Sequence, residues 1–454
     1  MLTVAELAQS LRGAIVQGDG RARITSVSTD SRTVNPGALF VALRGDRFDG
    51  HDYVASAIDR GALAALVERP LDVAVPQVIV ADSKRALGIA AAAWRVRFTM
   101  PLIAVTGSNG KTTVTQMIAA ILARAFGEKK RLATRGNLNN DIGLPLMLFE
   151  LNAQHKAAVL ELGMNHRGEI PYLAELAKPT VALVNNAQRE HQEFLESVEA
   201  TAHENGAAIA ALPPDGVAIF PADDACAGIW RGLAGTRRLL DFALSGFATL
   251  SAQYEVTAGG SRIALATPAG EIDIALPVPG KHNVRNALAA TAAALAVGVS
   301  TTDIAAALAG FSPPGGRGVR IALASGAALI DDTYNANPDS VRAAIDVLSA
   351  APAPRVLVLG DMGEVGAQGP AFHEEIAAYA RTRGIEELLC TGTATRATVA
   401  AFGGGARHFT SIDELIGACR TAASADTTLL VKGSRFMRME RVVQALTQAS
   451  AGAH

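Results

Sequence analysis

A short glycine-bearing loop between an apolar run and a helical segment constrains this chain more than any other feature. The run Pro101-Leu102-Ile103-Ala104-Val105 leads into Thr106-Gly107-Ser108-Asn109-Gly110-Lys111-Thr112-Thr113, and residues 114–124 then have a helical pattern. A strand, a glycine turn and a helix start in this order form a phosphate site, because backbone N–H groups and the helix dipole point at the anion. Lys111 adds a positive charge, and a threonine hydroxyl can hold Mg²⁺. The order therefore predicts a nucleotide-binding domain.

The spacing of this loop differs from that of the common P-loop. Four residues usually separate the two glycines, whereas only Ser108 and Asn109 lie between Gly107 and Gly110. A glycine turn followed by a surface lysine is the simpler interpretation of such a stretch. The combination of strand, loop, lysine, two threonines and helix in the right order favours the phosphate site.

Length and composition fit a soluble protein of several domains. The 454 residues exceed one ordinary core, and 49% are apolar while 19% are charged. The net charge of −2 gives no electrostatic footprint for nucleic acid or an anionic membrane. Residues 1–7 have the pattern of an amphipathic helix and not of a signal peptide, and no apolar run is long enough to span a bilayer. The three cysteines (Cys226, Cys390 and Cys419) lack metal-ligand spacing, which is typical of reduced thiols in a cytoplasmic protein.

The distribution of strand-like and helix-like segments predicts an α/β protein of three domains. Residues 1–82 contain short β-like runs broken by glycine and proline, and predict a small N-terminal α/β domain. Residues 83–312 carry the phosphate loop and continuous apolar runs of the kind that is buried in parallel sheets, and predict a central nucleotide domain. After the linker Ser312-Pro313-Pro314-Gly315-Gly316, residues 313–454 alternate strands with helices and predict a Rossmann-like C-terminal domain.

Local patterns predict an insert in the central domain and the individual strands and helices of the C-terminal domain. Residues 240–280 are rich in Ser, Thr and Gly and alternate in polarity, which predicts a small antiparallel insert in the central domain. In the C-terminal domain, the predicted strands are 329–331, 356–359, 388–390 and 429–431, and the predicted helices are 340–349, 370–383 and 436–447.

Polar residues at two strand ends of the central domain are candidates for a metal site. Glu161 ends the apolar run Ala158-Val159-Leu160, and the binding crevice of an open α/β sheet lies at the carboxyl ends of its strands. A carboxylate there, beside a phosphate loop, is placed to hold Mg²⁺ that bridges ATP oxygens; the alternative is a helix-capping acid. Asn185 and Asn186 end the next run, and His191 follows them. A lone histidine is usually structural, but this position would bring His191 to the same metal.

Three polar stretches close strands of the predicted C-terminal domain and would face the interdomain cleft. Asn337 in the first stretch is compatible with a simple turn that caps a helix at Ser340. Lys432 and Arg435 at one strand end suit an anionic substrate, with a solvated charge pair as the alternative. The stretches are 331–338, 360–364 and 432–435.

With these residues, the chain resembles the Mur ligase family over essentially its whole length. Within the family, the runs Gly136-Asn137-Leu138-Asn139-Asn140-Asp141 and Asp332-Thr333-Tyr334-Asn335-Ala336-Asn337 favour members that add a D-alanyl-D-alanine dipeptide. The Asp-Asn-Pro-Arg signature expected of the ligase that adds the third peptide residue is absent from the sequence. The other matching segments are 29–32, 47–52, 106–113, 161–163, 280–287, 360–362 and 432–435.

The resemblance implies an ADP-forming ligase of cytoplasmic peptidoglycan precursor synthesis. ATP would phosphorylate the C-terminal carboxylate of a UDP-N-acetylmuramoyl-tripeptide, and the amine of D-alanyl-D-alanine would then displace phosphate. The implied cofactors are ATP and Mg²⁺, and the implied partners are the two substrates, with no nucleic acid, no membrane segment and a monomeric protein. The residues agree with this chemistry, because bringing a γ-phosphate to a carboxylate requires cations such as Lys111 and Mg²⁺.

The resemblance also implies roles for individual residues. Lys111, Glu161 and His191 would be catalytic, and Thr112, Glu161 and His191 would hold the metal. ATP would be bound by Gly107, Ser108, Asn109, Gly110, Lys111, Thr112 and Thr113, with Asn283 at the adenine, Asp332 at the ribose and Arg317 at the phosphates. The substrates would be bound by Asp30, Ser31 and Arg32 at the UDP end, by Asn335, Asn337, Ser434 and Arg435 near the dipeptide, and by Asn137, Asn139, Asn140 and Asp141.

One departure from the family concerns the second metal. Family members generally carry a lysine after the His191 region, immediately before a glycine, and this lysine becomes a carbamate that holds a second Mg²⁺. The present chain has Asn205 at this position and no lysine between residues 178 and 281. Either Glu204, His203 or a water on Asn205 completes the metal site, or the second metal is held differently.

Other functions stay open at this point. One is a related Mur-type or folylpolyglutamate-type ligase that uses another amino acid, and its preferred amine would distinguish it. Another is a non-catalytic Mur-ligase-like binding partner with a decayed site, as Asn205 would suggest, although the ATP loop, Glu161 and His191 all persist. A phosphotransferase with the same loop would not need the segments that match the UDP site.

Overall fold

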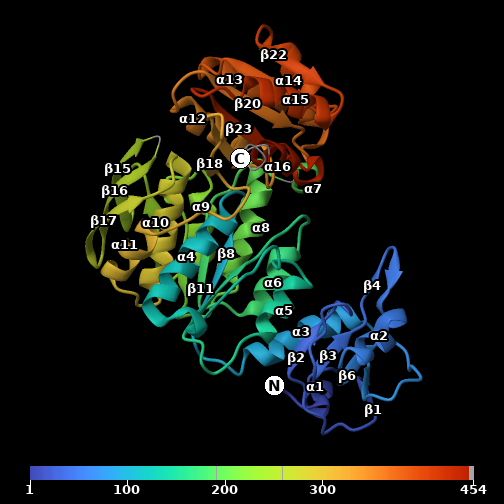
Figure 1. Ribbon diagram of the computed structural model, residues 1–454. Helices are drawn as coiled ribbons and strands as arrows, with labels where there is room; N and C mark the ends of the chain where they lie inside the picture. Colours follow the sequence, from blue (N-terminus) through green and yellow to red (C-terminus); the bar gives the residue numbers. More distant parts are fainter. Residues whose placement is uncertain (191, 258, 449–454) are drawn as a thin grey trace.

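The computed structural model describes residues 1–190, 192–257 and 259–448. It confirms an α/β protein of three bodies, which follow one another from the blue N-terminal end of the chain to the red C-terminal end (Figure 1). The described part of the chain contains no helix with the length and apolar character needed to cross a membrane.

The N-terminal body is a five-stranded sheet with small helices. Its order is β1-β7-β6-β3-β2, and all neighbouring strands are parallel except β1 and β7. The strands are β1 (Ile15–Gln17), β2 (Ser26–Ser28), β3 (Ala38–Val41), β6 (Ala64–Val67) and β7 (Gln77–Ile79), with a separate hairpin of β4 (Arg44–Gly45) and β5 (Phe48–Asp49). The helices are α1 (Val4–Gln9), η1 (Gly50–Tyr53) and α2 (Val54–Asp59).

Helix α3 (Ser83–Arg95) connects the first body to the second and packs on α5 and α6. Its buried Leu87 belongs to one apolar cluster that also contains Leu39 of the N-terminal sheet and Leu160 of the central sheet. The first two bodies therefore share a continuous core.

The central body is a six-stranded, all-parallel sheet of order β13-β12-β11-β8-β10-β9. Its strands are β8 (Leu102–Thr106), β9 (Arg131–Ala133), β10 (Ala157–Glu161), β11 (Val181–Val184), β12 (Val217–Ile219) and β13 (Arg238–Leu239). Its helices are α4 (Lys111–Phe126), η2 (Glu128–Lys130), α5 (Gly143–Phe149), α6 (Glu169–Ala177), α7 (Gln192–Leu195), α8 (Val198–Ala210), α9 (Ala227–Ala234), α10 (Lys281–Ala296) and α11 (Thr301–Ala309). Because β8 lies between β10 and β11, the segments that follow these three strands meet at one edge of the sheet.

The predicted insert is a four-stranded sheet against α10 and α11. The long strands β15 (Leu250–Thr257), β16 (Gly260–Thr267) and β17 (Gly270–Leu276) are antiparallel, as expected, whereas the short β14 (Phe242–Ala243) is parallel to β15. Alternate residues such as Ile263, Leu265 and Ile272 face the helices and belong to their apolar cluster. Period-two alternation therefore predicted the buried face of this sheet correctly.

The C-terminal body is a six-stranded sheet of order β18-β19-β23-β20-β21-β22, with only the edge strand β18 antiparallel. Its strands are β18 (Val319–Ala322), β19 (Ala328–Asp332), β20 (Arg355–Gly360), β21 (Glu387–Thr391), β22 (Ala406–Phe409) and β23 (Thr428–Lys432). Its helices are α12 (Pro338–Ser349), η3 (Gly366–Gln368), α13 (Gly369–Thr382), α14 (Thr395–Phe402), α15 (Ile412–Ala422), η4 (Arg435–Met437) and α16 (Glu440–Gln448).

Two details of the C-terminal body differ from the prediction. The helix predicted at 436–447 begins only at Glu440. Arg438, with a left-handed φ of 51°, interrupts the helical backbone between the 3₁₀ turn η4 and this helix. The short edge strands β18 and β22, together with α14 and α15, were absent from the prediction. Edge strands this short carry too few residues for a clear periodic signal.

Candidate functional site

The loop after β8 has the backbone conformation of a phosphate cradle. Gly107 has φ 127° and Gly110 has φ 82°, a region that favours glycine, and α4 begins at Lys111 directly after them. A Cβ on Gly110 would lie 2.6 Å from Asn185 Nδ2 and 2.6 Å from Asn286 Oδ1. Neither glycine therefore tolerates a side chain without rearrangement of its neighbours. The N–H groups in the first turn of α4 have no partner within the helix and are available to a ligand.

Polar side chains from two neighbouring segments hold the loop in place. Asn205 of α8 accepts a 2.8 Å hydrogen bond from the Gly107 N–H through Oδ1. Asn186, which follows β11, accepts from the Asn109 N–H at 2.9 Å, and Asn185 donates through Nδ2 to the Asn109 carbonyl at 2.8 Å. Asn185 and Asn205 are both 1% exposed. These hydrogen bonds fix the conformation of the loop in the absence of a ligand.

Lys111 folds back over the loop and pairs with a carboxylate. Its Nζ donates to the Gly107 carbonyl at 2.5 Å and to the Ser108 carbonyl at 3.2 Å, and lies 3.2 Å from Glu190 Oε2. The Lys111 side chain is 15% exposed and that of Glu190 is 6% exposed. Glu190 is a residue of this site that the sequence analysis did not single out, although it belongs to the polar run after β11.

Glu161 lies at the end of β10 with one oxygen engaged and one without a bond. Asn139 donates to its Oε1 at 2.7 Å, and its own N–H donates to Thr134 Oγ1 at 2.8 Å. Glu161 is 4% exposed, and its Oε2 has no hydrogen-bond partner among the described residues. A buried, unpartnered carboxylate oxygen is costly unless a cation or donor reaches it. Glu161 therefore has the chemistry of a ligand for a hard cation.

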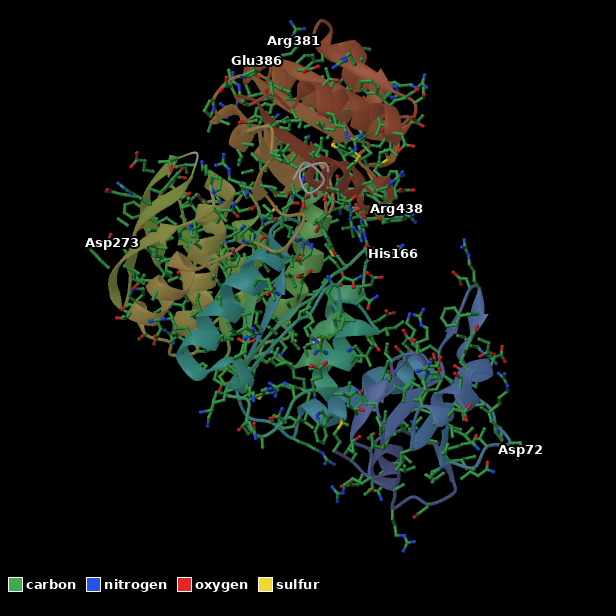
Figure 2. All side chains as sticks on the ribbon, in the orientation of Figure 1. Asp72, His166, Asp273, Arg381, Glu386 and Arg438 are labelled. Atoms are coloured by element: carbon green, nitrogen blue, oxygen red, sulfur yellow. The ribbon has the colours of Figure 1, made fainter. Side chains whose placement is uncertain are left out.

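A cavity of about 1150 Å³ lies between the central and C-terminal bodies, and both contribute to its walls. This volume is sufficient for a nucleoside triphosphate together with parts of other substrates. His166, labelled in Figure 2, lines it on the central side. The predicted residues that line the cavity are Ser108, Asn109, Gly110, Lys111, Thr112, Thr113, Asn137, Asn139, Asn140, Asp141, Glu161, Asn283, Arg317, Asp332, Asn335 and Asn337.

The C-terminal wall of the cavity includes Arg317 and Tyr334, and the Tyr334 ring lies near a second arginine, Arg435, which does not itself line the cavity. The guanidinium of Arg317 lies 4.0 Å from the centroid of the Tyr334 ring, and that of Arg435 lies 5.7 Å from the same centroid. Both distances are within the range of cation–π attraction. Asp332 ends β19 and pairs through Oδ2 with Lys432 Nζ at 2.6 Å, because the two residues are register partners on neighbouring strands.

Several residues predicted to bind ATP or the organic substrates have structural partners. Asn140 accepts through Oδ1 from the Gly143 N–H at 2.8 Å at the start of α5, and Asp141 forms an ion pair with Lys84. Asn283 donates to the Pro279 carbonyl at 2.8 Å. Ser434, which is 3% exposed, accepts from the Gly363 N–H at 2.6 Å and donates to the Ala336 carbonyl at 3.0 Å.

The predicted UDP residues lie outside this cavity, on an exposed turn of the N-terminal body. Arg32 donates to both carboxylate oxygens of Asp30, at 2.9 and 2.8 Å. These hydrogen bonds hold the pKa of Asp30 at about 2. Ser31 lies between the two residues. The structure thus brings most of the predicted residues to one cavity, whereas this turn and Gly107, Ser434 and Arg435 are not among its lining residues.

The prediction for His191 lies outside the described residues. The expectation for its neighbours on α8 requires correction. Glu204 accepts through Oε1 from the N–H groups of Gly168 at 2.9 Å and Ile170 at 3.0 Å, at the start of α6, and thus acts as a helix cap. Glu204 and His203 line a separate depression of about 480 Å³ and not the main cavity. Glu204 and His203 therefore do not complete the metal site in the main cavity, and the Oδ1 of Asn205 supports the phosphate loop instead.

Comparison with known proteins places the chain among ligases. The Mur ligase family, catalytic domain, matches residues 23–99, the Mur ligase middle domain matches residues 105–294, and the Mur ligase, glutamate ligase domain, matches residues 316–435. The chain is 41% identical over 453 residues to the UDP-N-acetylmuramoyl-tripeptide–D-alanyl-D-alanine ligase of Escherichia coli K12, with 98% of both chains covered. The chain belongs to the Mur ligase family.

Other members of the Mur ligase family agree with this assignment. The chain is 37% identical to the ligase of the same name from Haemophilus influenzae, again with 98% of both chains covered. It superposes on a crystal structure of MurF from Acinetobacter baumannii with a TM-score of 0.92 and 35% identity, over 98% of this chain and 99% of that chain. This Mur ligase therefore shares its three-body architecture with a solved relative.

Proposed function

We propose that this Mur ligase uses ATP to join D-alanyl-D-alanine to a UDP-N-acetylmuramoyl-tripeptide, with release of ADP and phosphate. The observation that carries the proposal is the preorganised loop at the cavity, in which Gly107, Gly110 and Lys111 form a phosphate cradle. The names and coverage of the relatives support the same substrates.

ATP would lie along the cavity with its phosphates on the loop. The N–H groups of the first turn of α4 would bind the phosphates, and Lys111 would leave Glu190 to neutralise the transferring group. By analogy with the family, Asn283 would contact the adenine and Asp332 the ribose. Arg317 would reach the phosphates from the C-terminal body, on the opposite wall.

The residues present also fit a magnesium ion. The unpartnered Oε2 of Glu161 and the hydroxyl of Thr112 belong to the same cavity and are oxygen ligands of the kind that Mg²⁺ prefers. Thr112 and Glu161 would hold the ion, with His191 as the third ligand that the family suggests. When bound, Mg²⁺ would supply charge neutralisation on the phosphate oxygens. Asn139 would keep the Glu161 carboxylate oriented through its hydrogen bond to Oε1.

The reaction follows from the poor reactivity of a carboxylate toward an amine. An oxygen of the tripeptide carboxylate attacks the γ-phosphorus, the bond between this phosphorus and the β–γ bridging oxygen breaks, and ADP leaves. The free amine of the dipeptide then attacks the acyl carbon. The tetrahedral intermediate expels phosphate as its C–O bond breaks, and the nitrogen loses a proton to form the amide. Lys111 would stabilise the charge that develops during the first transfer.

The remaining predicted residues would bind the two organic substrates. Asp30, Ser31 and Arg32 would hold the UDP end, and Asn335, Asn337, Ser434 and Arg435 would lie near the dipeptide. Asn137, Asn139, Asn140 and Asp141 would border the path of the peptide along the cavity. We also propose a cytoplasmic monomer, because ATP is a cytoplasmic substrate and a single chain supplies both walls of the cavity.

The proposal is tested with purified protein, ATP, Mg²⁺ and UDP-N-acetylmuramoyl-tripeptide. Mass spectrometry should show a pentapeptide product when D-alanyl-D-alanine is the added amine. L-alanine, D-glutamate and L-glutamate added singly should give no product. A product with one of these amino acids, and none with the dipeptide, would assign the chain to a neighbouring ligase activity.

A further inference from the structure

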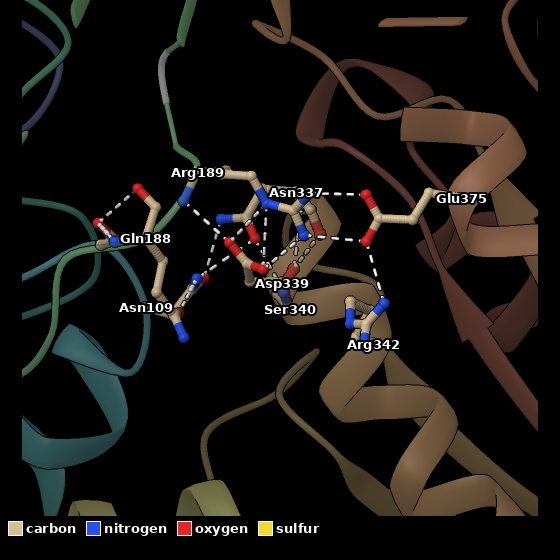
Figure 3. A network of polar contacts seen from close by, with 9 residues as sticks. Asn109, Gln188, Arg189, Asn337, Asp339, Ser340, Arg342 and Glu375 are labelled. Carbon is tan, nitrogen blue, oxygen red and sulfur yellow. Dashed lines mark hydrogen bonds and ion pairs between the residues drawn. The ribbon is translucent and has the colours of Figure 1, made fainter. Parts of the chain in front are cut away.

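A single arginine from the central body reaches across to the C-terminal body. Arg189 follows β11, and its guanidinium contacts Asp339 of α12 at 2.7 Å and Glu375 of α13 at 2.7 Å (Figure 3). Its backbone N–H also donates to Asp339 Oδ2 at 2.9 Å. The guanidinium lies 5.2 Å from the centroid of the Phe372 ring. One side chain therefore contacts two helices of the other body.

The geometry makes this contact stronger than an ordinary surface ion pair. Arg189, Asp339 and Glu375 have side chains that are 24%, 21% and 33% exposed, so water screens them only in part. The bonds to Asp339 raise the pKa of Arg189, and the bonds from Arg189 lower the pKa of Glu375. A planar guanidinium that binds two carboxylates through several N–H groups also fixes orientation, which a point charge does not.

The contact is continuous with the phosphate loop. Asn337 is the N-cap of α12, two residues before Asp339, and exchanges two side-chain hydrogen bonds with Asn109 of the loop, at 2.9 and 3.2 Å. Gln188, which precedes Arg189, accepts from Asn109 Nδ2 at 2.7 Å. The start of α12 is thus fastened to the loop and to the segment after β11 together.

We propose that Arg189 is a positioning residue, which holds the C-terminal body over the phosphate loop before the substrates bind. Arg189 would affect the reaction by positioning α12 and Tyr334, which precedes α12. The Tyr334 ring in turn contacts the guanidinium of Arg317. Arg189 itself touches no reacting atom. The link to catalysis rests on the proposed function, whereas the positioning of the two bodies does not.

Replacement of Arg189 should change the kinetics in a way that loss of a purely structural residue would not. Without Arg189, the C-terminal body would adopt several positions relative to the central body. A ligand that bridges both bodies would bind only the fraction of molecules in which the C-terminal body lies over the phosphate loop. The apparent KM for ATP should therefore rise on the order of tenfold, while kcat at saturating ATP stays nearly unchanged. A stability defect alone would lower the active fraction, and with it kcat, at constant KM.

Small-angle scattering of the ligand-free protein tests the positioning directly. Arg189→Ala should have a larger radius of gyration than the wild type, and Arg189→Lys an intermediate one. Arg355→Ala is the matched control, because Arg355 forms a comparable two-pronged pair with Glu386 inside the C-terminal body. The control should scatter like the wild type.

A double-mutant cycle supplies the second test. Glu375→Gln in an Arg189→Ala background should add little to the rise in KM, because both changes remove one shared contact. Scattering of folded Arg189→Ala identical to that of the wild type, or a fall in kcat without a rise in KM, would overturn the proposal. If Arg189→Ala is expanded but the wild-type protein shows no ligation, the positioning role of Arg189 stands and the proposed function is overturned.

Discussion

The phosphate loop and the Asp30–Arg32 turn differ in how they are held. The loop is bound by buried asparagines from the end of β11 and from α8, and Lys111 at its end is mostly covered. On the turn, Arg32 bonds within the turn to Asp30, and its side chain is 84% exposed. The loop is thus held by buried neighbours, whereas the hydrogen bonds of the turn lie within the turn itself and are exposed to water.

This difference suggests a division of labour. Groups that act on a developing charge are most effective when they need no reorganisation at the moment of reaction. Groups that only recruit a substrate can be ordered by it, at a cost in affinity. Changes at the loop should therefore reduce kcat or ATP binding strongly, and changes at the turn should alter the KM of the UDP-linked substrate alone.

The largest effect is expected for Lys111→Ala. Removal of one preorganised donor from a transferring phosphoryl group costs about 3 kcal/mol in the barrier, or a factor on the order of 10² in rate. Product formation should fall by at least this factor while the circular dichroism spectrum stays native. Arg124→Ala, near the other end of α4, is the control, because Arg124 forms an exposed ion pair with Asp303, far from the phosphate loop in the sequence of α4. Undiminished ligation by folded Lys111→Ala would contradict the catalytic role of the loop.

Gly110→Ala should have the second largest effect. Its Cβ would meet Asn185 and Asn286 at 2.6 Å, and the left-handed backbone adds about 1–2 kcal/mol of strain. Gly127→Ala, at the other end of α4, also places a side chain on a positive-φ backbone (φ 98°, ψ 146°) that is at least as strained, but no atom lies within 4 Å of the new Cβ. Both variants should melt earlier, but only Gly110→Ala should lose ATP binding in calorimetry. Equal ATP affinities for the two variants would show that the cradle tolerates distortion.

Asn205→Ala measures the support of the loop from α8. It leaves the Gly107 N–H without its acceptor, which costs about 1–3 kcal/mol for a buried donor. The KM for ATP should rise roughly tenfold as the loop loses its fixed geometry. His203→Ala, on an exposed position of the same helix, should change neither stability nor KM. An unchanged KM for Asn205→Ala would mean that the loop keeps its shape without this bond.

Arg32→Ala should affect only one substrate. The KM for the UDP-linked peptide should rise several-fold, and the melting temperature and the KM for ATP should stay constant. Arg21→Ala provides a close match, since Arg21 donates to Asp19 two residues earlier on a similarly exposed segment. A parallel rise in the KM for ATP would show that the turn and the loop are not independent.

The smallest expected effect is that of bicarbonate, which should be none. A lysine carbamate forms reversibly from CO₂, but the Asn205 amide nitrogen is not a nucleophile, and its oxygen is already engaged by Gly107. Activity after degassing should therefore equal activity with added bicarbonate. A clear rise with bicarbonate would reveal a carbamate elsewhere in the chain.

The two regions also differ in what the sequence made predictable. The loop, Glu161 and the strand ends could be placed in one cavity because parallel strands bring their carboxyl ends to a single edge. The role of Glu204 could not be predicted, since its partners, the N–H groups of Gly168 and Ile170, lie more than thirty residues away. Helical periodicity does not say which neighbouring element a side chain will cap.

The contact made by Arg189 was outside the reach of sequence for the same reason. Its two carboxylates lie 150 and 186 residues later in the chain. Their proximity depends on the packing of two separate sheets, which local patterns do not encode. Short edge strands such as β18 and β22 escaped prediction because their neighbours in the sheet, and not their own period, define them.

Phosphate release tests the central claim most directly. Wild-type protein is incubated with ATP, Mg²⁺ and UDP-N-acetylmuramoyl-tripeptide, with and without D-alanyl-D-alanine, and inorganic phosphate is measured over time. We predict sustained release of one phosphate per amide bond formed when all components are present, and none above background without the dipeptide. Release at the same rate without the dipeptide, or no release with every component present, would contradict the assignment of this cavity as the site of dipeptide ligation.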